Sequence, residues 1–561
     1  MAMQVCFSGN PMLVSRHVLS GLPVELLPLQ ETLVAVRAGN HHGIRPLAVL
    51  PGFRQKHRSR GHLPVHVFRQ GQVAHVQRMI HFSRLISLVH TSIIHVKGFS
   101  FQPRIVATSD GLCYTERILI SEVRMDKKYD CIIIGGGAAG LLTAARLDLT
   151  AFSPKGAGLI LEATDSPGTK LRMSGAGHCN FTHDGSVKDM VAAYGEQGRA
   201  IRRVLYRYNN DAFVDFLDRH GIPSFSRDGG RVFPKSEKAQ DILNFLLDFS
   251  AENGFALKKG FRVSQVTRLP DAGWQVACDN GSAFRTAAMV IATGGKSFPA
   301  TGSNGRMWDV LSRDLDVEVI SPRPVLAPVA VRSYPYGPVA GLSFETAELS
   351  VTAPGKKIQR SVGDLLLTHR DFSGPAALNI CGAAEPGDAL HINYVYPRSR
   401  EEVTGILSEI FSGKKGNPVS AMASRLSLPR RFCQSILLRS LGKSIDADDV
   451  FRGSSNVNGL SPKKVSALLC DDTFTVESLP DWNKAMATRG GIALSQLDLR
   501  TMEFREHPGL FAVGEALNVD GITGGYNLQF AFSSASVCAE SLQKKLRADS
   551  PVQGLRPSTE E

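Results

Sequence analysis

Apolar residues between positions 129 and 162 follow the order of a strand, a turn, a helix and a second strand. Residues 129–134 (YDCIII) form a short, nearly continuous apolar run, which is typical of a strand buried on both faces of a parallel sheet. A glycine-rich turn follows, residues 141–147 fit a helix, and residues 158–161 form a second apolar run that ends in Glu162. This order predicts a βαβ unit within a parallel sheet.

Weaker patterns extend the prediction to the rest of the chain. Residues 325–397 combine alternating apolar positions with frequent glycine and proline, which favours strands. Residues 398–469 are predicted to be mostly helical, because Ser399 and Glu402 fit a capping box and Ser461 precedes a first-turn proline. Three further buried strands are predicted at residues 289–292, 365–367 and 510–513.

The composition is that of an ordinary globular protein. Of 561 residues, 43% are hydrophobic and 21% are charged. No apolar run approaches the roughly 20 residues needed to cross a bilayer. The nine cysteines include no CxxC pair, which favours a reducing compartment and no structural zinc. We therefore expect a cytoplasmic protein without a membrane span and without a bound metal.

The positive charge is concentrated at the front of the chain. The formal net charge is +12, from 64 basic and 52 acidic side chains. Residues 1–124 hold 14 of the basic and 5 of the acidic ones, which leaves 50 and 47, or +3, for the other 437 residues. Ten of the 16 histidines also lie in residues 1–124. Strong basicity is therefore not a property of the part that carries the βαβ pattern.

No fold is predicted for residues 1–124, because they show neither a helical period nor strand alternation. They also lack the basic, apolar and small-residue order of a secretory signal. Three interpretations stay open. The segment is a transit peptide, since arginine is abundant and acids are few; or it is a nucleic-acid-binding arm built on residues 54–60 (RQKHRSR); or an upstream start was chosen and the native chain begins at Met125.

The turn after the first strand, GGGAAG, has the spacing of a dinucleotide-binding loop. Gly135 permits a tight turn out of the strand, Gly137 leaves room for the backbone to approach a pyrophosphate, and Gly140 lets the helix pack against the sheet. The helix N-terminus, at Ala138 and Ala139, offers free N–H groups and a partial positive charge to phosphates.

A carboxylate stands at the matching position of the second strand. Glu162 lies 22 residues beyond Gly140, where it can accept hydrogen bonds from both hydroxyls of an adenosine ribose and disfavours a 2′-phosphate. The turn is therefore predicted to hold FAD or NAD(H) rather than NADP(H). A turn that serves packing alone is the alternative.

The motifs that follow favour FAD over NAD(H). They are Gly168-Thr169-Lys170, residues 174–182 (SGAGHCNFT), 292–295 (ATGG), 368–369 (TH), 373–375 (SGP), 509–515 (GLFAVGE) and 523–529 (TGGYNLQ). In this combination the chain resembles the bacterial family of FAD-dependent flavoproteins described as aminoacetone-oxidase-like or bile-acid-reductase-like. The resemblance covers about residues 127–545 and does not extend to the front segment.

The resemblance implies an α/β fold of the two-dinucleotide-motif, glutathione-reductase-like type. An FAD domain is formed by both ends of the matching region, with a β-rich unit and a helical unit inserted between them. The implied boundaries are a basic N-terminal extension at 1–124, the first part of the FAD-binding domain at 125–324, the β-rich unit at 325–397, the helical unit at 398–470, a return strand of the β-rich unit at 471–484, the second part of the FAD-binding domain at 485–548 and a tail at 549–561.

Further cofactor contacts follow from the resemblance. Ala292, Thr293 and Gly294 are similar to the second flavin motif, where a small-residue turn lets the chain pass close to the dinucleotide. Gly514 and Glu515 occupy the position where an acidic side chain accepts a ribityl hydroxyl. The remaining expected contacts are Lys170 with a phosphate or the adenine, Ser174 and Gly175 beside the flavin ring, and Gly525, Asn527 and Leu528 at its pyrimidine edge.

The chain departs from the family pattern at three positions. Ala176 and His178 stand where the family usually has Gly and Arg, and Asn518 stands where it often has Asp. Because histidine titrates near neutral pH and arginine does not, a local anion or substrate contact at His178 would become pH-dependent.

Four residues are candidates for a catalytic role. Cys179 is a candidate redox thiol beside the flavin, and His369 a candidate proton donor. Tyr526 is a candidate hydroxyl donor to a carbonyl substrate, and His178 is the candidate pH-dependent contact. For each of them, a packing or hydrogen-bonding role is the alternative.

The function predicted from these motifs is that of an FAD-dependent oxidoreductase that transfers hydride to or from flavin N5. In one version it reduces an activated carbon–carbon double bond of a small or sterol-like substrate. NAD(P)H is then a transient donor, because the chain has one GxGxxG fingerprint. In the other version it oxidises an amine or aminoketone with oxygen. We expect a small-molecule substrate, with no membrane and no nucleic acid as partner; a flavin-bearing RNA-associated factor is the alternative of another class.

Overall fold

The computed structural model describes residues 128–548, apart from 153–155, 228, 355–357, 414–415 and 446–458, and five strands in the front segment. The chain divides into two compact units, residues 1–124 and 125–561. Residues 54–60 and Met125, on which two interpretations of the front segment rest, lie outside the described residues. The strands of the first unit are β1 (Met3–Phe7), β2 (Asn10–Val14), β3 (His95–Val96), β4 (Phe99–Thr108) and β5 (Gly111–Leu119).

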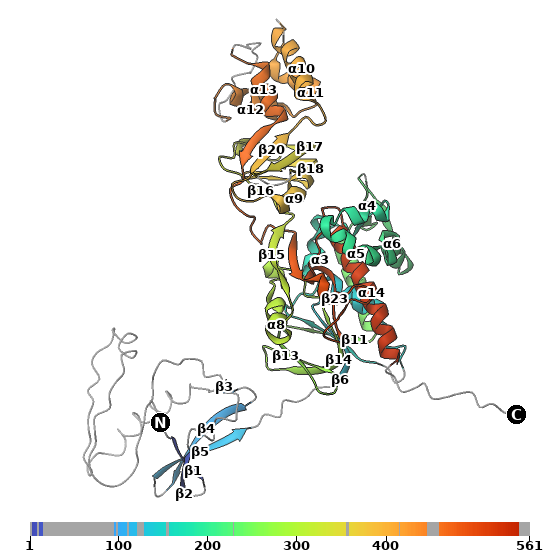
Figure 1. The fold of residues 1–561 in the computed structure, drawn as a ribbon, viewed down its shortest axis with the longest axis vertical. Helices are drawn as coiled ribbons and strands as arrows, with labels where there is room; N and C mark the ends of the chain where they lie inside the picture. The colour runs from blue at the N-terminus through green and yellow to red at the C-terminus, as the bar shows by residue number, and fades with distance from the viewer. Residues whose placement is uncertain are drawn as a thin grey trace, which may run out of the picture. The chain divides into compact units, whose positions relative to one another are not determined.

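The second unit is built on a nine-stranded sheet (Figure 1). The order β11–β7–β6–β14–β25 is parallel, β24 and β23 continue it antiparallel, and β13 with β12 forms an antiparallel extension of β14. The strands are β6 (Lys128–Ile134), β7 (Gly158–Glu162), β11 (Phe255–Lys259), β12 (Val263–Arg268), β13 (Trp274–Cys278), β14 (Ala283–Ile291), β23 (Leu497–Asp498), β24 (Glu503–Phe504) and β25 (Leu510–Ala512).

Helices cover this sheet because its central strands are apolar on both faces. The second half of β6 and all of β7 are buried. Helix α2 packs against α7 and α14, so segments from both ends of the unit lie side by side. The helices of this domain are α2 (Ala138–Arg146), α3 (Thr169–Met173), α4 (Val187–Ala192), α5 (Gly195–Arg207), α6 (Asn210–Arg219), α7 (Ala239–Glu252), α8 (Arg306–Leu315) and α14 (Tyr526–Ala548).

A small antiparallel sheet, ordered β8–β10–β9, lies between these helices in the sequence and packs on α14 and α6. Its strands are β8 (Thr182–His183), β9 (Ser224–Ser226) and β10 (Arg231–Pro234). This sheet matters for the site, because β8 directly follows the small-residue segment 174–181 and contacts the start of α14.

The chain leaves and re-enters the large sheet's domain through two paired strands, β15 (Val319–Val325) and β22 (Ala487–Ile492). Beyond them lies a six-stranded antiparallel sheet in the order β16–β19–β18–β17–β20–β21, with its own hydrophobic core. Its strands are β16 (Val329–Ala330), β17 (Ser343–Thr352), β18 (Gln359–Leu367), β19 (Asp371–Ser373), β20 (Ala389–Asn393) and β21 (Asp472–Thr475). Its helices are α9 (Pro375–Ile380), α10 (Arg400–Ser412), α11 (Pro418–Leu426), α12 (Arg430–Ser440) and α13 (Pro462–Cys470).

The predicted α/β fold class is confirmed, with small differences at the element ends. The first helix begins at Ala138 rather than near residue 141, because Gly137 already has the extended conformation of an N-cap. The expected capping box is present: Ser399 accepts from the N–H of Glu402, and the Glu402 carboxylate accepts from that of Ser399. The strand expected at 289–292 is the buried end of β14, which starts at Ala283.

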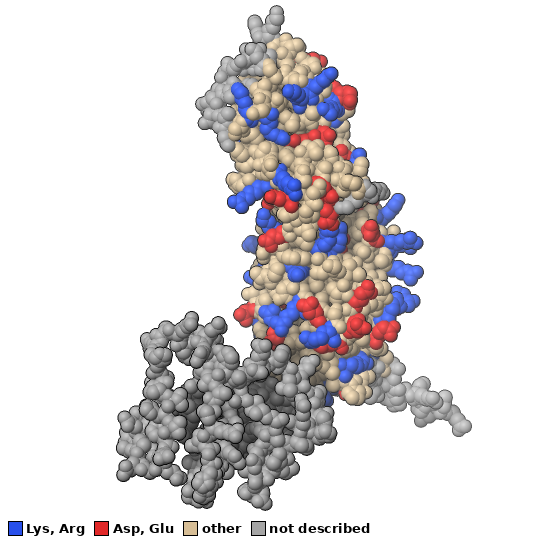
Figure 2. Space-filling model, turned by 60° about the vertical axis from the view of Figure 1, so that its left-hand side comes forward, with Lys and Arg blue, Asp and Glu red and all other residues tan. Residues whose placement is uncertain are grey.

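The structure bears on two expectations, the absence of a membrane span and the even charge of the second unit. In the part of the chain that the structure describes, no helix combines the length and apolar character needed to span a bilayer. Basic and acidic side chains are interspersed over the face of the second unit seen in Figure 2, in keeping with the +3 net charge of residues 125–561.

Candidate active site

A cavity of about 930 Å³ opens at the ends of β6, β7 and β14 and extends to the inserted β-rich unit. Most of the predicted cofactor-binding residues line it. They are Gly135, Gly137, Ala138, Ala139, Glu162, Lys170, Ser174, Gly175, Ala292, Thr293, Gly294, Glu515, Gly525, Asn527 and Leu528.

Gly140 and Gly514, the two other predicted contacts, are outside the lining and have packing roles. A Cβ on Gly140 would lie 2.0 Å from the carbonyl oxygen of Gly135, and a Cβ on Gly514 would lie 2.6 Å from the Cβ of Ala139. Both glycines therefore let α2 approach the strand ends, which keeps the glycine turn in place.

The start of α2 fits a diphosphate. Gly137 is the N-cap, with no side-chain cap and no acidic residue in the first turn. A Cβ on Gly137 would have no atom within 4 Å, although this residue lines the cavity. The structure therefore has open space in front of the free N–H groups and positive end of the helix, where an anion is stabilised.

Glu162 is fixed in position by three hydrogen bonds. Its carboxylate accepts from the N–H of Gly136 at 2.8 Å and from the N–H and Oγ1 of Thr164, both at 2.7 Å. The residue is 8% exposed and lines the cavity. A carboxylate offers about four acceptor sites, so capacity remains for a ribose hydroxyl.

A second polar atom in the same wall also fits a bound dinucleotide. Ser303 is 7% exposed and lines the cavity, and its buried Oγ has no hydrogen-bond partner among the described residues. Buried hydroxyls without a partner are rare in proteins. This hydroxyl and the open cradle at Gly137 therefore both fit FAD.

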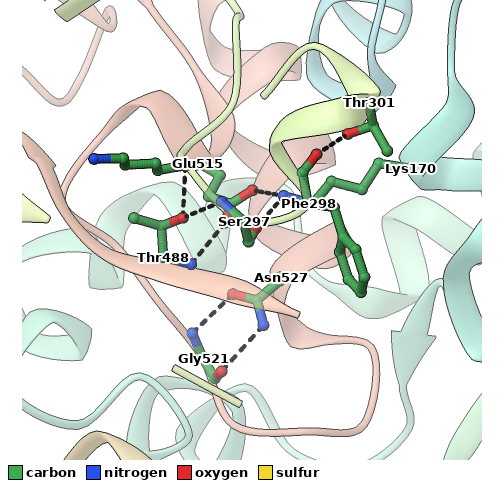
Figure 3. A network of polar contacts seen from close by, with 9 residues as sticks. Lys170, Ser297, Phe298, Thr301, Thr488, Glu515, Gly521 and Asn527 are labelled. Carbon is green, nitrogen blue, oxygen red and sulfur yellow. Dashed lines mark hydrogen bonds and ion pairs between the residues drawn. The ribbon is translucent and has the colours of Figure 1, made fainter. Parts of the chain in front are cut away.

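Lys170 and Glu515, 345 residues apart in the sequence, form an ion pair with an N–O distance of 2.6 Å (Figure 3). Ser297 accepts from Lys170 Nζ at 2.5 Å and donates to Glu515 Oε1 at 3.2 Å, and the N–H of Thr488 donates to the same oxygen at 2.7 Å. The network joins the two parts of the FAD domain. Lys170, expected at a phosphate or the adenine, thus contacts the predicted ribityl-binding residue.

The segment 174–183 packs against the glycines that precede α14. A Cβ on Gly525 would lie 2.6 Å from the carbonyl oxygen of Thr182. One orientation of the Asn180 side-chain amide gives hydrogen bonds to both its nitrogen and its oxygen. In it, the nitrogen donates to the carbonyls of Thr182 and Val232, and the oxygen accepts from the N–H of Gly525 at 3.2 Å. Asn527, a predicted cofactor contact, bonds the N–H and C=O of Gly521, each at 3.0 Å (Figure 3).

The four predicted catalytic candidates are all outside the cavity lining. Cys179 is fully buried, and burial raises the pKa of its thiol to about 11 despite a hydrogen bond with Ser174. Tyr526 stacks on His183, and burial, with the charges of Asp189 and Asp184, raises the pKa of its hydroxyl.

The two candidate histidines are on the surface side of their loops. His178 Nδ1 bonds the backbone carbonyl of Glu237 at 3.1 Å and lies 3.6 Å from its carboxylate. His369 is exposed, with its backbone carbonyl packed against Gly337. Roles for these four residues therefore stay predictions.

Other residues that line the cavity were not among the predicted cofactor contacts. Polar ones are Asn180, His183, Arg231, Ser303 and Asp364, and apolar ones are Met173, Leu326, Leu378, Met486 and Ile522. Asn180, His183 and Ile522 had a signal nearby, since they lie within or beside the motifs 174–182 and 523–529.

A dinucleotide cradle formed by both ends of the unit, with residues of the inserted β-rich unit in the same cavity lining, defines a flavoprotein oxidoreductase. The chain belongs to the family described as HI0933-like protein Rossmann domain, whose model matches residues 129–541. The predicted family resemblance is confirmed, and the protein is an FAD-dependent oxidoreductase.

Several curated proteins are similar to this chain. Ribosomal RNA dihydrouridine synthase of Escherichia coli is 28% identical over 418 residues, which cover 74% of this chain and 98% of that protein. The protein of the same name from Haemophilus influenzae is 29% identical over 75% of this chain and 100% of that protein. The 3-dehydro-bile acid delta(4,6)-reductase of Clostridium scindens is 25% identical over 74% of this chain and 98% of that protein.

Proposed function

We propose that this oxidoreductase saturates a carbon–carbon double bond conjugated to a carbonyl group in a small apolar ring compound. The observation that carries the proposal is an apolar wall of the cavity. Leu326, Leu378 and Met486, from the inserted segment between β14 and β25, line it. Pockets that bind apolar ligands have such walls, with a few polar groups that fix orientation.

Exposed apolar side chains of the cavity lining add support for a ligand-binding role. Met173, Met486 and Ile522 line the cavity and are 49%, 52% and 40% exposed. Large apolar side chains grouped at the mouth of a cavity are typical of a ligand groove. An apolar ring bound there would remove part of their surface from water, which is favourable by about 25 cal/mol per Å².

The reaction class is supported by the names of the relatives. A delta(4,6)-reductase acting on a 3-dehydro-bile acid and a dihydrouridine synthase both saturate a ring double bond. FAD, when bound, supplies the hydride for such a step. The chain has one GxGxxG turn, so we propose that NAD(P)H binds transiently as the donor of electrons.

Anaerobic stopped-flow spectroscopy of the FAD-loaded protein tests this proposal. NAD(P)H should bleach the flavin, and progesterone, a ketone with a conjugated ring double bond, should restore its colour and gain two hydrogens by mass spectrometry. Bleaching by an amine instead, with hydrogen peroxide formed in air, would favour the oxidase.

A second candidate is the same reaction on a uracil ring in RNA, and one surface favours it. Arg199, Arg202, Arg203 and Tyr206 lie on one face of α5 and are exposed. Among the described residues the three arginines have no ion-pair partner. Basic side chains interleaved with an aromatic ring bind phosphates and stack on bases. The two dihydrouridine synthases, matched over nearly their whole length, add support.

RNA binding measured at several salt concentrations separates the two candidates. Under the RNA hypothesis, an R199A/R202A/R203A variant loses salt-dependent affinity for a uridine-containing oligonucleotide, whereas Arg219→Ala, an exposed arginine paired with Asp215 on α6, does not. Deletion of residues 1–124 tests the front segment. If deletion abolishes RNA binding and the α5 variant retains it, the anchor is the front segment.

A further inference from the structure

We propose that His183 is the proton donor to the substrate, a role that rests on the proposed reductase function. Saturation of a conjugated double bond needs a hydride at the carbon β to the carbonyl and a proton at the α carbon. FAD, when bound, would supply the hydride, and an acidic group in the cavity would supply the proton. The structure places His183 in the cavity wall, beside the glycines that precede α14.

The hydrogen bonds of His183 leave one ring nitrogen available. Nδ1 lies 2.7 Å from the carbonyl oxygen of Asp184. Because a carbonyl only accepts, Nδ1 carries a proton and donates it. Among the described residues, Nε2 has no hydrogen-bond partner. A second proton on Nε2 is therefore free for transfer, and the ring that remains keeps its Nδ1–H bond.

Close packing fixes the direction of the ring. A Cβ on Gly230 would lie 2.3 Å from Cε1 of His183, and a Cβ on Gly524 would lie 3.1 Å from its Cδ2. Nε2 is the ring atom between Cε1 and Cδ2, so it lies at the edge between these two glycine turns. Tyr526 stacks on the face of the ring, with centroids 5.0 Å apart and planes at 15°. Such support holds a catalytic group in one orientation.

The other titratable side chains of the lining are less suited to give a proton. Glu162 and Glu515 accept hydrogen bonds from groups around them, and Lys170 is paired with Glu515. An exposed carboxylate such as Asp364 accepts rather than donates when ionised. The arginines remain charged throughout, and they are Arg231, Arg262 and Arg306.

Bonds and electrons balance in the proposed step. The π bond of the substrate breaks, one C–H bond forms at the β carbon with the hydride, and a second forms at the α carbon with the proton from Nε2. The Nε2–H bond breaks, and neutral His183 regains its proton from solvent. The substrate is reduced by two electrons, and NAD(P)H, the donor of the proposed function, is oxidised overall.

The test compares FAD-loaded wild-type protein with His183→Gln, His183→Ala and a control, His220→Gln. His220 is a matched control, because its Nδ1 also bonds a backbone carbonyl, that of Phe216 at 2.6 Å, and its ring packs on Phe249. It is outside the cavity lining. For each protein we would measure the FAD dissociation constant, the rate of anaerobic reduction by NAD(P)H and the rate of reoxidation by progesterone or a uridine-containing RNA oligonucleotide.

We expect His183→Gln to slow reoxidation by roughly 10²- to 10⁴-fold, the usual contribution of a general acid. FAD affinity and reduction by NAD(P)H should stay unchanged in His183→Gln, and the control should match the wild type in all three measurements. Added imidazole should restore part of the rate of His183→Ala, which a purely structural role would not predict.

Two results overturn the proposal while leaving the proposed function intact. One is a His183→Gln variant that is reoxidised at the wild-type rate; the other is a variant that loses FAD affinity, which would assign His183 to cofactor binding. If neither probe reoxidises the wild type, the proposed function itself fails, and the proton donor fails with it.

Discussion

Replacing Gly137 by valine is expected to weaken FAD binding strongly and to leave the fold intact. Gly137 has φ −85° and ψ −173°, an extended conformation that a β-branched residue adopts readily. A Cβ at this position would meet no atom within 4 Å. The free energy of unfolding of the protein without cofactor should therefore change by less than about 0.5 kcal/mol.

The loss of FAD affinity can be estimated from the groups at the start of α2. The valine side chain would fill the space in front of the N–H groups of Ala138 and Ala139, which both line the cavity. A hydrogen bond to a charged group contributes about 1.5–3 kcal/mol, so loss of two costs about 3–6 kcal/mol. Since about 1.4 kcal/mol is a factor of ten, the dissociation constant should rise by roughly 10²- to 10⁴-fold.

Gly140→Ala is the contrasting variant. Its Cβ would lie 2.0 Å from the carbonyl oxygen of Gly135, a backbone atom at the end of β6, so the helix or the strand must shift. Overpacking of this kind costs about 1–3 kcal/mol. Urea unfolding without cofactor and fluorescence titration with FAD measure the two effects. Wild-type FAD affinity in Gly137→Val, or wild-type stability in Gly140→Ala, would refute the reasoning.

Two further variants test other contacts of the cavity lining. Glu162→Ala should weaken FAD by about 1.5–3 kcal/mol in a fluorescence titration, and wild-type occupancy would contradict the ribose assignment. Lys170→Met leaves the Glu515 carboxylate, 18% exposed, without its cation, and should lower the free energy of unfolding by about 1–2 kcal/mol in urea; an unchanged midpoint would argue against the network.

Burial alone would raise the pKa of Glu540, but hydrogen bonds from Lys544 and Tyr208 and the charge of Arg207 lower it to about 2 from 4.5. The ionised Glu540 carboxylate therefore contributes about 1 kcal/mol to the free energy of unfolding after solvent screening. This contribution is present above pH 4.5 and is lost as the pH falls towards 2. Glu540→Gln should lower the free energy of unfolding at neutral pH and make it change less with pH in the acid range.

The glycine turn could be predicted from the sequence because the contacts that form it are local. Gly135, Gly137 and Gly140 are close together in the chain, and Glu162 follows at the end of the neighbouring strand. Their roles depend on backbone space and on a helix N-terminus, which a short motif specifies. The capping box at Ser399 was predictable for the same reason.

Contacts between distant segments could not be predicted in this way. The pairing of Lys170 with Glu515 depends on how the two ends of the FAD domain meet, and no local pattern encodes that distance. The motif containing Tyr526 suggested a hydroxyl donor. In the structure the ring of Tyr526 packs on His183, and it is His183 that reaches the cavity lining.

The proposed substrate side is hardest to predict, because its wall consists of single side chains from separate strands and loops. Met486 is one of them, and at 52% exposed it contributes little to the core. Met486→Ala should therefore leave stability and FAD affinity unchanged and raise the KM for progesterone by roughly 3- to 10-fold, since removal of part of an apolar contact costs about 1 kcal/mol. Leu479→Ala is the matched control, because Leu479 is 44% exposed but outside the lining. Equal KM values for the two variants would mean that the apolar wall does not bind the substrate.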